Sequence, residues 1–369
     1  MNYKLSESWN DVQDIIVFGL GKQGKKVFDK LNQDFNIIAI IDNNLAIKEY
    51  KNIPVIKLSE IDDCINHKII VTMSEYNYSS AKKELIKKGL LEFEDFCNSQ
   101  TFVSEWYLKN KQELCVIKTD IFITSLCSLK CKDCMMQIPY FKEYKTSDFE
   151  TVKQTVDNYF AMVDYVFDMD IVGGEPFLND DIINILQYID KKYRSKIAYL
   201  GVITNGTIIP SDKDMLSLKD MNIGISLSDY SLKLNNTLRE KIEGFINKCD
   251  EYNIKIYRNT NIDWFDFGFR THRYNYSGDA LKMHAQICNP VCHMIYNNKF
   301  YYCGVAWAAE KSGYTNEDFN NCVDLTKTDK DSLYYCSIGR NEKGYLNACA
   351  CCGGFGIDNN NLVETGVQI

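Results

Sequence analysis

Three cysteines lie within eight residues of this chain, at Cys127, Cys131 and Cys134. Spacings of three and then two residues allow one short loop to present three thiolates to a cuboidal iron–sulfur cluster, whose irons are bound by cysteine. A [4Fe–4S] cluster has four irons, so this loop leaves one iron without a protein ligand. An open iron can bind a substrate or cofactor, and the motif therefore predicts chemistry rather than electron storage. Zinc is the alternative, because zinc takes thiolates at similar spacings.

Composition narrows the class of protein. The chain has 369 residues, a net charge of −8, 45% hydrophobic and 25% charged residues, which is typical of a globular protein of two or three domains. The acidic balance disfavours a nucleic-acid or anionic-membrane partner. The start has no apolar signal region, and no apolar run is long enough to span a membrane. Fifteen cysteines in such a chain favour metal ligation and reduced thiols, which predicts a cytoplasmic protein.

Residues 14–42 read as strand, glycine turn, helix and strand, which is the fingerprint of a dinucleotide-binding unit. The candidate nucleotide-binding residues are Gly19, Gly21, Gly24 and Asp42. In such a unit the backbone approaches a phosphate at a helix N-terminus, and the acid binds a ribose hydroxyl. The pattern stops near residue 110, so we expect a half-sized Rossmann-like domain over 1–110. A scaffold whose glycines serve only the turn is the alternative.

Residues 14–95 also resemble the nucleotide-sugar-binding N-terminal domains of sugar acyltransferases and similar domains of surface-polysaccharide enzymes. This resemblance implies a ligand like uridine diphosphate as readily as NAD.

Strands and helices alternate from residue 116 onward, which predicts a parallel sheet or partial barrel over 111–280 with its chemistry at the carboxyl ends of the strands. The expected strands are 116–124, 170–172, 198–204, 223–227 and 254–257, and the expected helices are 147–166, 180–194, 217–220 and 237–252. Regularity fades and cysteine density rises near Leu281, which predicts a third domain over 281–369. The run Asn359–Asn361 and the residues after it predict a mobile tail.

Two more motifs follow the cysteine loop in order: Gly173-Gly174-Glu175-Pro176 after the next strand, and Thr204-Asn205-Gly206 at the end of the one after that. With the cysteines they resemble the radical S-adenosylmethionine (SAM) enzymes over residues 116–260. The resemblance implies a partial (β/α)6 barrel and a [4Fe–4S] cluster on the three cysteines, with SAM chelating the open iron. The SAM-binding residues that it implies are Gly173, Gly174, Glu175, Pro176, Thr204, Asn205, Ser226, Ser228 and Arg258.

The resemblance also implies the reaction. A reduced cluster would cleave SAM to a 5′-deoxyadenosyl radical, which abstracts hydrogen from an unactivated carbon, and a flavodoxin- or ferredoxin-type protein would supply the electron. The family usually carries an aromatic residue before the third cysteine, where this chain has Asp133. Tyr140 or Phe141 would then have to provide the adenine contact.

A second group of cysteines lies near the end of the chain. Cys292 and Cys303 flank a hairpin-like stretch, and Cys349 and Cys352 follow. This arrangement resembles the twitch extension of radical SAM enzymes, a smaller version of the SPASM extension, and implies one auxiliary [4Fe–4S] cluster on these four thiolates. Zinc suits four thiolates equally. The sequence leaves open the roles of Cys288, Cys322, Cys336 and Cys351.

Three functions follow from these motifs. The favoured one is a radical SAM oxidoreductase or epimerase acting on a sugar, cyclitol or nucleotide sugar, with the front domain holding the nucleotide. A radical SAM maturase that modifies a peptide or protein is the alternative, which the glycine fingerprint disfavours because such enzymes often carry a winged-helix front domain. An electron carrier or zinc-stabilised binding module would use the same cysteines, but the loop 173–176 disfavours it.

Overall fold

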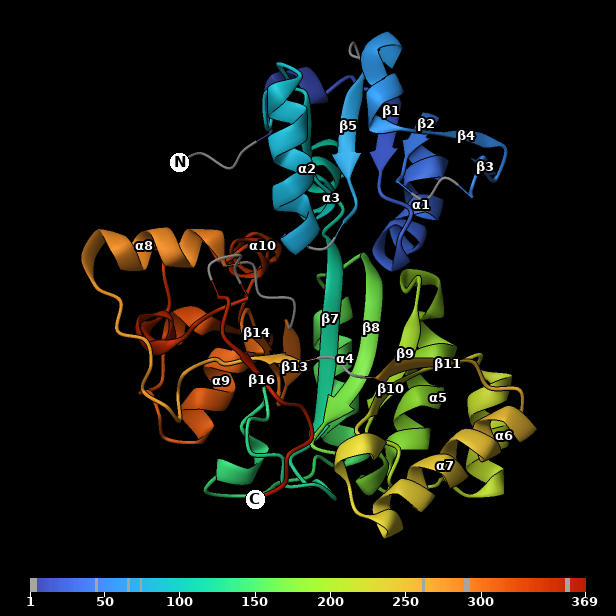
Figure 1. Ribbon diagram of the computed structural model, residues 1–369, viewed down its shortest axis with the longest axis vertical. Coiled ribbons are helices and arrows are strands. Elements are labelled where there is room, and N and C mark those ends of the chain that lie inside the picture. Colours follow the sequence, from blue (N-terminus) through green and yellow to red (C-terminus); the bar gives the residue numbers. More distant parts are fainter. Residues whose placement is uncertain are drawn as a thin grey trace. The chain divides into compact units, whose positions relative to one another are not determined.

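The computed structural model describes residues 5–43, 46–64, 67–73, 75–260, 263–288, 293–355 and 359–369. This described part divides into two compact units, unit 1 with residues 1–117 and 163–167, and unit 2 with residues 118–162 and 168–369 (Figure 1). The predicted boundary near Leu281 falls inside helix α8 (Gly278–Ile287), and both sides of it belong to unit 2. The division into three domains therefore remains a prediction.

Unit 1 contains a mostly parallel sheet with the strand order β3-β4-β2-β1-β5-β6 among the described residues. Its strands are β1 (Asp14–Phe18), β2 (Asn36–Ile41), β3 (Glu49–Tyr50), β4 (Ile53–Ile56), β5 (Lys68–Val71) and β6 (Phe96–Asn98), and its helices are α1 (Lys22–Asp34), α2 (Glu75–Lys87) and α3 (Ser99–Lys111). Only the described pair β3–β4 is antiparallel. The winding changes direction between β1 and β5, which is where sheets of this type bind ligands. The loop after β1 lies at that point.

The apolar residues of β1 are buried on both faces, as is typical of a parallel strand covered by helices on either side. Helix α3, which the sequence pattern does not predict, packs Phe102 and Trp106 against Phe35. The same core includes Cys115 and Phe167, which lie near the starts of β7 and β8. Unit 1 therefore takes part of its core from a segment beyond residue 117.

Unit 2 contains a larger sheet, with the order β11-β10-β9-β8-β7-β13-β14-β15 among the described residues. Its strands are β7 (Cys115–Thr124), β8 (Tyr165–Gly173), β9 (Leu200–Thr204), β10 (Gly224–Asp229), β11 (Ile256–Thr260), β13 (Met294–Tyr296), β14 (Lys299–Tyr301) and β15 (Cys322–Asp324), and a separate pair is formed by β12 (Trp264–Phe265) and β16 (Leu362–Val363). Its helices are α4 (Phe149–Phe160), α5 (Ile182–Tyr193), α6 (Asp212–Asp220), α7 (Asn236–Glu251), α8, α9 (Gly304–Lys311) and α10 (Lys330–Ser337).

The sheet is open, and the predicted six βα repeats are not all present in the described residues. The strands β7 to β11 lie in chain order, and the pairs β8–β9, β9–β10 and β10–β11 are parallel. After β11 the chain forms β12, which pairs with β16 instead of extending the sheet. The sheet grows on its other side, where β13 pairs with β7. The prediction of a mixed α/β fold is confirmed, and the part of the chain that the structure describes contains no sixth barrel strand after β11.

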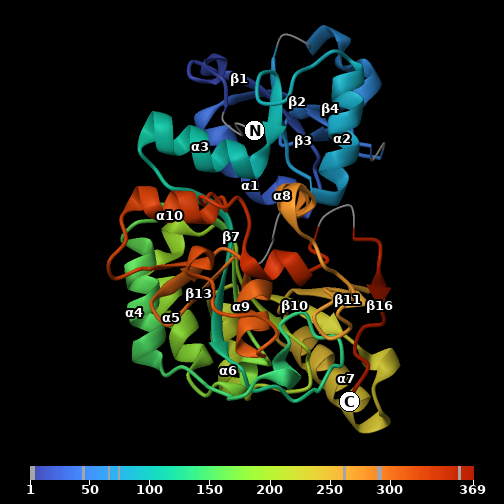
Figure 2. The ribbon, with the colours of Figure 1, turned by 90° about the vertical axis from the view of Figure 1, so that its left-hand side faces the viewer.

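The two faces of β7 serve different purposes. Thr119 bonds the hydroxyl of Tyr159 on α4 at 2.7 Å, so this face packs on the helices that connect the strands. Phe122 lies on the opposite face and contacts Trp307 of α9, with ring centroids 4.9 Å apart. In Figure 2, α9 lies in front of the sheet and α4 lies to the left of it. The end of β7 that leads into the cysteine loop therefore lies next to α9.

Helix α4 begins where the sequence predicts. The Asp148 side chain accepts a hydrogen bond from the Thr151 N–H at 2.8 Å and caps the helix. The expected extension to residue 166 is wrong, because the helix ends at Phe160 and β8 starts at Tyr165. The buried residues of β8 do not alternate along the strand, so the apolar run could be read as a continuation of the helix.

The predicted hairpin after residue 292 is confirmed as β13 and β14. Asn297 and Asn298 form its turn, with φ angles of 50° and 58°. Asparagine tolerates this left-handed region better than other residues that carry a Cβ, so the hairpin forms without a glycine.

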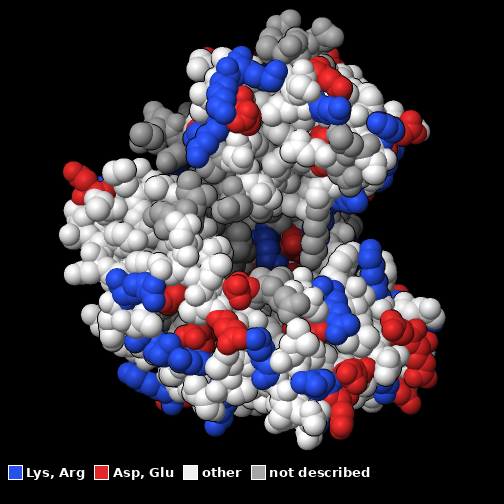
Figure 3. Space-filling model, in the orientation of Figure 1, with Lys and Arg blue, Asp and Glu red and all other residues white. Residues whose placement is uncertain are grey.

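On the face drawn in Figure 3, acidic and basic side chains are interspersed among uncharged ones. No helix among the described residues combines the length and apolar character needed to cross a membrane.

Candidate active site

The cysteine loop follows Thr124, the last residue of β7. Cys131 is buried, and Cys127 and Cys134 are half-buried. The three thiols are close enough to affect one another electrostatically. Burial, followed by charge repulsion from Cys134 and Cys131, raises the pKa of Cys127 to about 12. The structure therefore brings together the three cysteines that the sequence selects.

Hydrogen-bond donors point at the sulfur atoms of this loop. Cys127 Sγ accepts from the Leu129 N–H at 3.4 Å and from Asn205 Nδ2 at 3.7 Å. Cys131 Sγ accepts from Gln368 Nε2 at 3.3 Å. Such donors stabilise sulfur that carries negative charge, as a thiolate bound to iron does.

Cys134 receives the same support from the backbone. Burial raises its pKa, while the N–H groups of Ile138, Met136 and Gln137 lower it. Buried thiols of this kind lose their protons when a metal binds them. The donor set of three thiols, each with its own N–H donors, fits an iron–sulfur cluster. Among the described residues, no three His, Cys, Asp or Glu side chains converge so as to hold a single metal ion.

The loop Gly173–Pro176 lies against the start of the cysteine loop. Gly174 N–H donates to the Thr124 carbonyl at 2.7 Å, and Glu175 N–H donates to the Leu126 carbonyl at 2.7 Å. A Cβ on Gly173 would lie 2.5 Å from the Thr124 oxygen, and one on Gly174 would lie 2.3 Å from the Leu126 oxygen. The two glycines therefore let one backbone approach the other.

Replacing Gly174 by alanine should destabilise unit 2 by about 1–3 kcal/mol, the usual effect of forcing an extra group into a packed site. The Leu126 carbonyl is backbone and cannot rotate away from the new methyl group. Urea denaturation of G174A beside the native protein measures the change. G244A is the matched control, because a Cβ at Gly244 meets only the mobile end of Ile209 at 3.0 Å. Equal stability of G174A and the native protein would contradict the contact.

Glu175 is fully buried, and its carboxylate accepts hydrogen bonds from other groups of the protein. It accepts from Thr204 Oγ1 at 2.8 Å, the Asn205 N–H at 2.8 Å and the Phe177 N–H at 3.2 Å. Burial raises the pKa of this carboxyl to about 7. The carboxylate thus joins the loop 173–176 to the end of β9, and the predicted contact of this loop with SAM is left to its backbone.

Asn205 connects β9 to the cysteine loop. Its Nδ2 donates to Ser128 Oγ at 3.2 Å as well as to Cys127 Sγ, and its Oδ1 accepts from the Thr207 N–H at 3.0 Å. Thr207 in turn bonds the Ser128 hydroxyl. Ser128 and Thr207 are site residues that the sequence analysis missed, since a serine or threonine near a turn carries no distinctive signal.

The ends of β10 and β11 carry the remaining predicted residues. Ser226 is buried, and Ser228 lies two residues on, on the same face of β10. Arg258 on β11 forms an ion pair with the buried side chain of Asp229. A contact of Arg258 with the SAM carboxylate would have to compete with this ion pair, and it remains a prediction.

Tyr230, which the sequence analysis missed, lies near all three cysteines. Burial raises its pKa, and the charges of Cys131, Cys134 and Cys127 add to the increase. Its ring meets Trp264 edge-on, with centroids 5.4 Å apart. Tyr230 also borders a small pocket whose other lining residues are Asp229, Leu232, Lys233, Asp263, Glu364 and Thr365.

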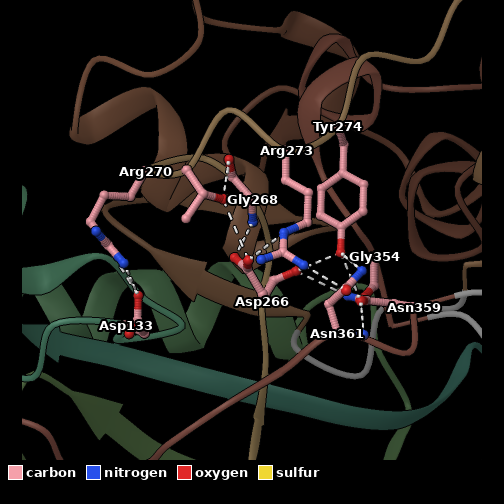
Figure 4. Close-up of polar contacts among 10 residues, drawn as sticks. Asp133, Asp266, Gly268, Arg270, Arg273, Tyr274, Gly354, Asn359 and Asn361 are labelled. Atoms are coloured by element: carbon pink, nitrogen blue, oxygen red, sulfur yellow. Dashed lines mark hydrogen bonds and ion pairs between the residues drawn. The ribbon is translucent and has the colours of Figure 1, made fainter.

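Asp133, which replaces the family's usual aromatic residue, is paired with an arginine. Arg270 donates to Asp133 Oδ1 from Nη2 at 2.9 Å and from Nε at 3.2 Å (Figure 4). Of the two proposed substitutes, Phe141 is buried against Trp307, and the Tyr140 hydroxyl donates to the Lys132 carbonyl at 2.8 Å. The structure therefore directs Phe141 into the core, and only Tyr140 remains as a candidate for the adenine contact.

The expectation of a mobile tail is wrong. Asn359 Nδ2 donates to the Gly354 carbonyl at 3.0 Å, and its Oδ1 accepts from the Tyr274 hydroxyl at 2.9 Å (Figure 4). Asn361 Oδ1 accepts a hydrogen bond from Arg273 Nη1 at 2.6 Å. These amides satisfy backbone and side-chain groups of the segment 266–274, so the asparagine run is structural rather than a linker.

Two of the cysteines predicted to bind the auxiliary cluster, Cys303 and Cys349, lie near Tyr302. Burial raises the pKa of Tyr302, and the charges of four cysteines add to it, in the order Cys288, Cys303, Cys349 and Cys336. Burial and then Cys288 also raise the pKa of Cys352. Cys292 lies outside the described residues. Cys288 is thus near the predicted ligands, although the sequence analysis assigned it no role.

N–H donors point at these sulfurs too. The Ala306 N–H donates to Cys303 Sγ at 3.4 Å, at the start of α9. The Gly354 N–H donates to Cys352 Sγ at 3.3 Å, and the Phe355 N–H donates to Cys288 Sγ at 3.4 Å. The pattern repeats that of the first cysteine loop.

The glycine turn of unit 1 follows β1. Gly19 has a φ of 110°, and a Cβ on Gly24 would lie 2.0 Å from the Gly19 oxygen, so both positions require glycine. Nothing lies within 4 Å of a Cβ built on Gly21. Asp42 Oδ2 accepts a hydrogen bond from the Leu20 N–H at 2.7 Å. The residue that is predicted to bind a ribose hydroxyl therefore also stabilises the glycine turn.

Two protein-family models match the chain. Residues 121–263 match the radical SAM superfamily, and residues 12–93 match the family described as C2185-like, N-terminal. Residues 121–263 form a radical SAM domain. A radical SAM domain indicates an enzyme, and it implies a [4Fe–4S] cluster that works with SAM.

Curated proteins with similar sequences match part of the chain. An uncharacterised protein of Methanocaldococcus jannaschii is 30% identical over 118 residues, which are 32% of this chain and 40% of that protein. The subtilosin biosynthesis protein AlbA of Bacillus subtilis is 30% identical over 132 residues (34% and 28%), and the GTP 3′,8-cyclase of Campylobacter jejuni is 27% identical over 152 residues (38% and 45%). The chain thus spans less than half the length of each of these relatives.

The chain also aligns in part with solved structures of other proteins. The structure of anSMEcpe with bound AdoMet aligns over 62% of this chain and 81% of its own, with 13% identity and a TM-score of 0.43. BtrN in complex with AdoMet and 2-DOIA aligns over 67% and 97%, with 13% identity and a TM-score of 0.38.

Proposed function

We propose that this protein is a radical SAM enzyme whose cluster is bound by Cys127, Cys131 and Cys134. The observation that carries the proposal is the set of three gathered thiols with N–H donors at each sulfur, inside the region that matches the radical SAM family. The bound cluster and SAM would supply the 5′-deoxyadenosyl radical that abstracts hydrogen from a substrate carbon.

The chain's own residues would hold SAM beside the loop. The backbone of Gly173–Pro176 is fixed against Thr124 and Leu126, and would meet the amino group of SAM. Thr204 and Asn205 keep that loop in place through Glu175. Ser226 and Ser228 would contact the ribose or carboxylate at the end of β10. The buried surroundings of Tyr230 would exclude water on that side.

Iron content and SAM cleavage test the proposal together. The protein is reconstituted without oxygen, its iron and sulfide are counted, and 5′-deoxyadenosine is measured after reduction. About four irons per chain with cleavage of SAM supports one cluster, and about eight supports two. A loaded, reduced protein that releases no 5′-deoxyadenosine with any of a range of substrates would overturn the proposal. Reduction by dithionite and by a flavodoxin or ferredoxin, in parallel, tests for a protein electron donor.

We infer that the second group of cysteines binds an auxiliary [4Fe–4S] cluster in a twitch-like extension. Support comes from the N–H donors at Cys303 and Cys352 and from the gathering of thiols around Tyr302. The fourth ligand is Cys292, as the sequence suggests, or Cys288, which lies near Cys352.

Replacing Cys349 and Cys352 together by alanine should remove about half of the iron of a two-cluster protein and leave the rest. The variants C288A and C292A, measured separately, should differ in iron content, because only the cysteine that binds the cluster is required to retain it. Loss of zinc instead of iron from the double variant would contradict the cluster.

We propose a sugar, cyclitol or nucleotide sugar as the substrate, with oxidation or epimerisation of one carbon. Support comes from the glycine turn of unit 1, which lies where the winding of a Rossmann-like sheet changes direction. A peptide or protein substrate is the second candidate, and the similarity to AlbA over 132 residues favours it. Incubation with nucleotide sugars and with short cysteine-containing peptides, scored by deuterium transfer from substrate into 5′-deoxyadenosine, separates the two.

Replacing Gly21 by alanine should weaken nucleotide binding to unit 1 at least about tenfold, which is about 1.4 kcal/mol. Space is free around a Cβ there, and the backbone φ is −68°, so folding should be unaffected. The new methyl group would meet a phosphate that approaches the start of α1. Isothermal titration with uridine diphosphate and with NAD measures the change. If G21A has the native melting temperature and binds both nucleotides with unaltered affinity, the proposed nucleotide site is wrong.

A further inference from the structure

The segment 366–369 pairs with the cysteine loop. The Lys132 N–H donates to the Val367 carbonyl at 2.7 Å, and the Ile369 N–H donates to the Lys130 carbonyl at 3.0 Å. Cys131 and Gln368 face each other in this antiparallel bridge. A stretch more than 230 residues away in sequence therefore lies directly on the loop that holds the three thiols.

Gln368 uses both ends of its amide. Its Oε1 accepts from the Lys130 N–H at 2.7 Å, which fixes the orientation of the group. Its Nε2 donates to the Gly366 carbonyl at 2.7 Å and to Cys131 Sγ at 3.3 Å. An amide held by two backbone groups presents its remaining N–H to the sulfur with little freedom to turn away.

The segment itself is anchored at a distance from the loop. Residues of β16 pair with β12, with Leu362 opposite Phe265 and Val363 opposite Trp264. Gly366 has a φ of 71°, and a Cβ there would lie 2.7 Å from Cβ of Tyr230. Glycine at this position lets the chain pass Tyr230 and reach Cys131.

We propose, on the basis of the radical SAM function proposed above, that Gln368 is a positioning residue that sets the reduction potential of the cluster through Cys131. A hydrogen bond to a ligand sulfur stabilises the more negative, reduced state, and such bonds are among the factors that fix the potential of iron–sulfur clusters. The segment 366–369 also covers one side of the loop, so it limits access of water to that ligand.

Two substitutions separate the hydrogen bond from packing. Q368E keeps an oxygen for the Lys130 N–H and loses the N–H that points at sulfur, and Q368L loses both while keeping a similar volume. V367A is the matched control, because Val367 joins the bridge through its backbone carbonyl. Each protein is loaded with iron, and the midpoint potential of the cluster is measured by redox titration followed by electron paramagnetic resonance.

We expect Q368L to shift the one-electron redox equilibrium about tenfold toward the oxidised cluster. This shift corresponds to a midpoint potential that is about 59 mV lower than that of the native protein. Q368E should shift it further, because its charge opposes an added electron, and V367A should leave it unchanged. Native iron content with unchanged potentials in both Gln368 variants would overturn the inference. Equal shifts in V367A would also overturn it, since they would assign the effect to packing. Failure of the native protein to hold iron or cleave SAM would instead overturn the proposed function.

Discussion

A variant with Cys127, Cys131 and Cys134 all replaced by alanine should lose SAM cleavage completely and retain a folded chain. In the proposed site each thiolate would be a direct ligand, so its loss would remove an iron bond that no neighbouring group replaces. The loop also has backbone pairing that does not depend on the thiols, including the bonds of Lys132 and Ile369. The variant should therefore keep its secondary structure.

The measurement combines iron content, 5′-deoxyadenosine release and circular dichroism. If the auxiliary site is occupied, about four irons should remain, and their absorbance should persist without any cleavage of SAM. The C97A variant is the control, because Cys97 is buried in unit 1 and far in sequence from both groups. Cleavage by the triple variant would refute the assignment of the loop.

Replacing Glu175 by alanine should destabilise the protein by about 3 kcal/mol or more, because buried donors left without an acceptor cost about 1–3 kcal/mol each. Three donors lose their acceptor, namely Thr204 Oγ1 and the N–H groups of Asn205 and Phe177. The same change should release the loop 173–176 from the end of β9 and reduce SAM affinity. Urea denaturation and equilibrium dialysis with SAM measure the two effects.

Glu175 also predicts a pH dependence of stability. Burial raises the pKa of this carboxyl from 4.5 to about 7, so the folded chain holds a proton that the unfolded chain has already lost. Stability from this group is therefore greatest at low pH, and falls as the pH rises from about 4.5 to about 7. The loss is about 3 kcal/mol at about 1.4 kcal/mol per pKa unit. The E175Q variant should lack this fall, and a native-like slope in E175Q would assign the titration to another group.

The local parts of the site could be predicted from the sequence. The cysteine spacing and the loop Gly173–Pro176 are short motifs at strand ends, and the alternation of strands and helices placed them together. The hairpin β13–β14 was also predictable, although its turn uses Asn297 and Asn298 instead of glycine. In each case the neighbours in the chain determine the structure.

The contacts that could not be predicted join residues far apart in the chain. Arg270 reaches Asp133 across 137 residues, and Gln368 reaches Cys131 across 237. Neither arginine nor glutamine in a loop signals its partner, since the partner depends on how β12 and β16 direct the segments around them. The engagement of Glu175 with β9 was missed for a related reason, because a conspicuous carboxylate suggests a ligand more readily than an internal brace.

The composition of the core of unit 1 limits how the chain can be divided. Phe167, which is 1% exposed, belongs to that core together with Cys115, yet it follows α4 and lies 50 residues beyond residue 117. A fragment ending at residue 117 would lack this ring, and a fragment beginning at 118 would expose it to water. Limited proteolysis near residue 117 should therefore destabilise both pieces instead of releasing a stable N-terminal fragment.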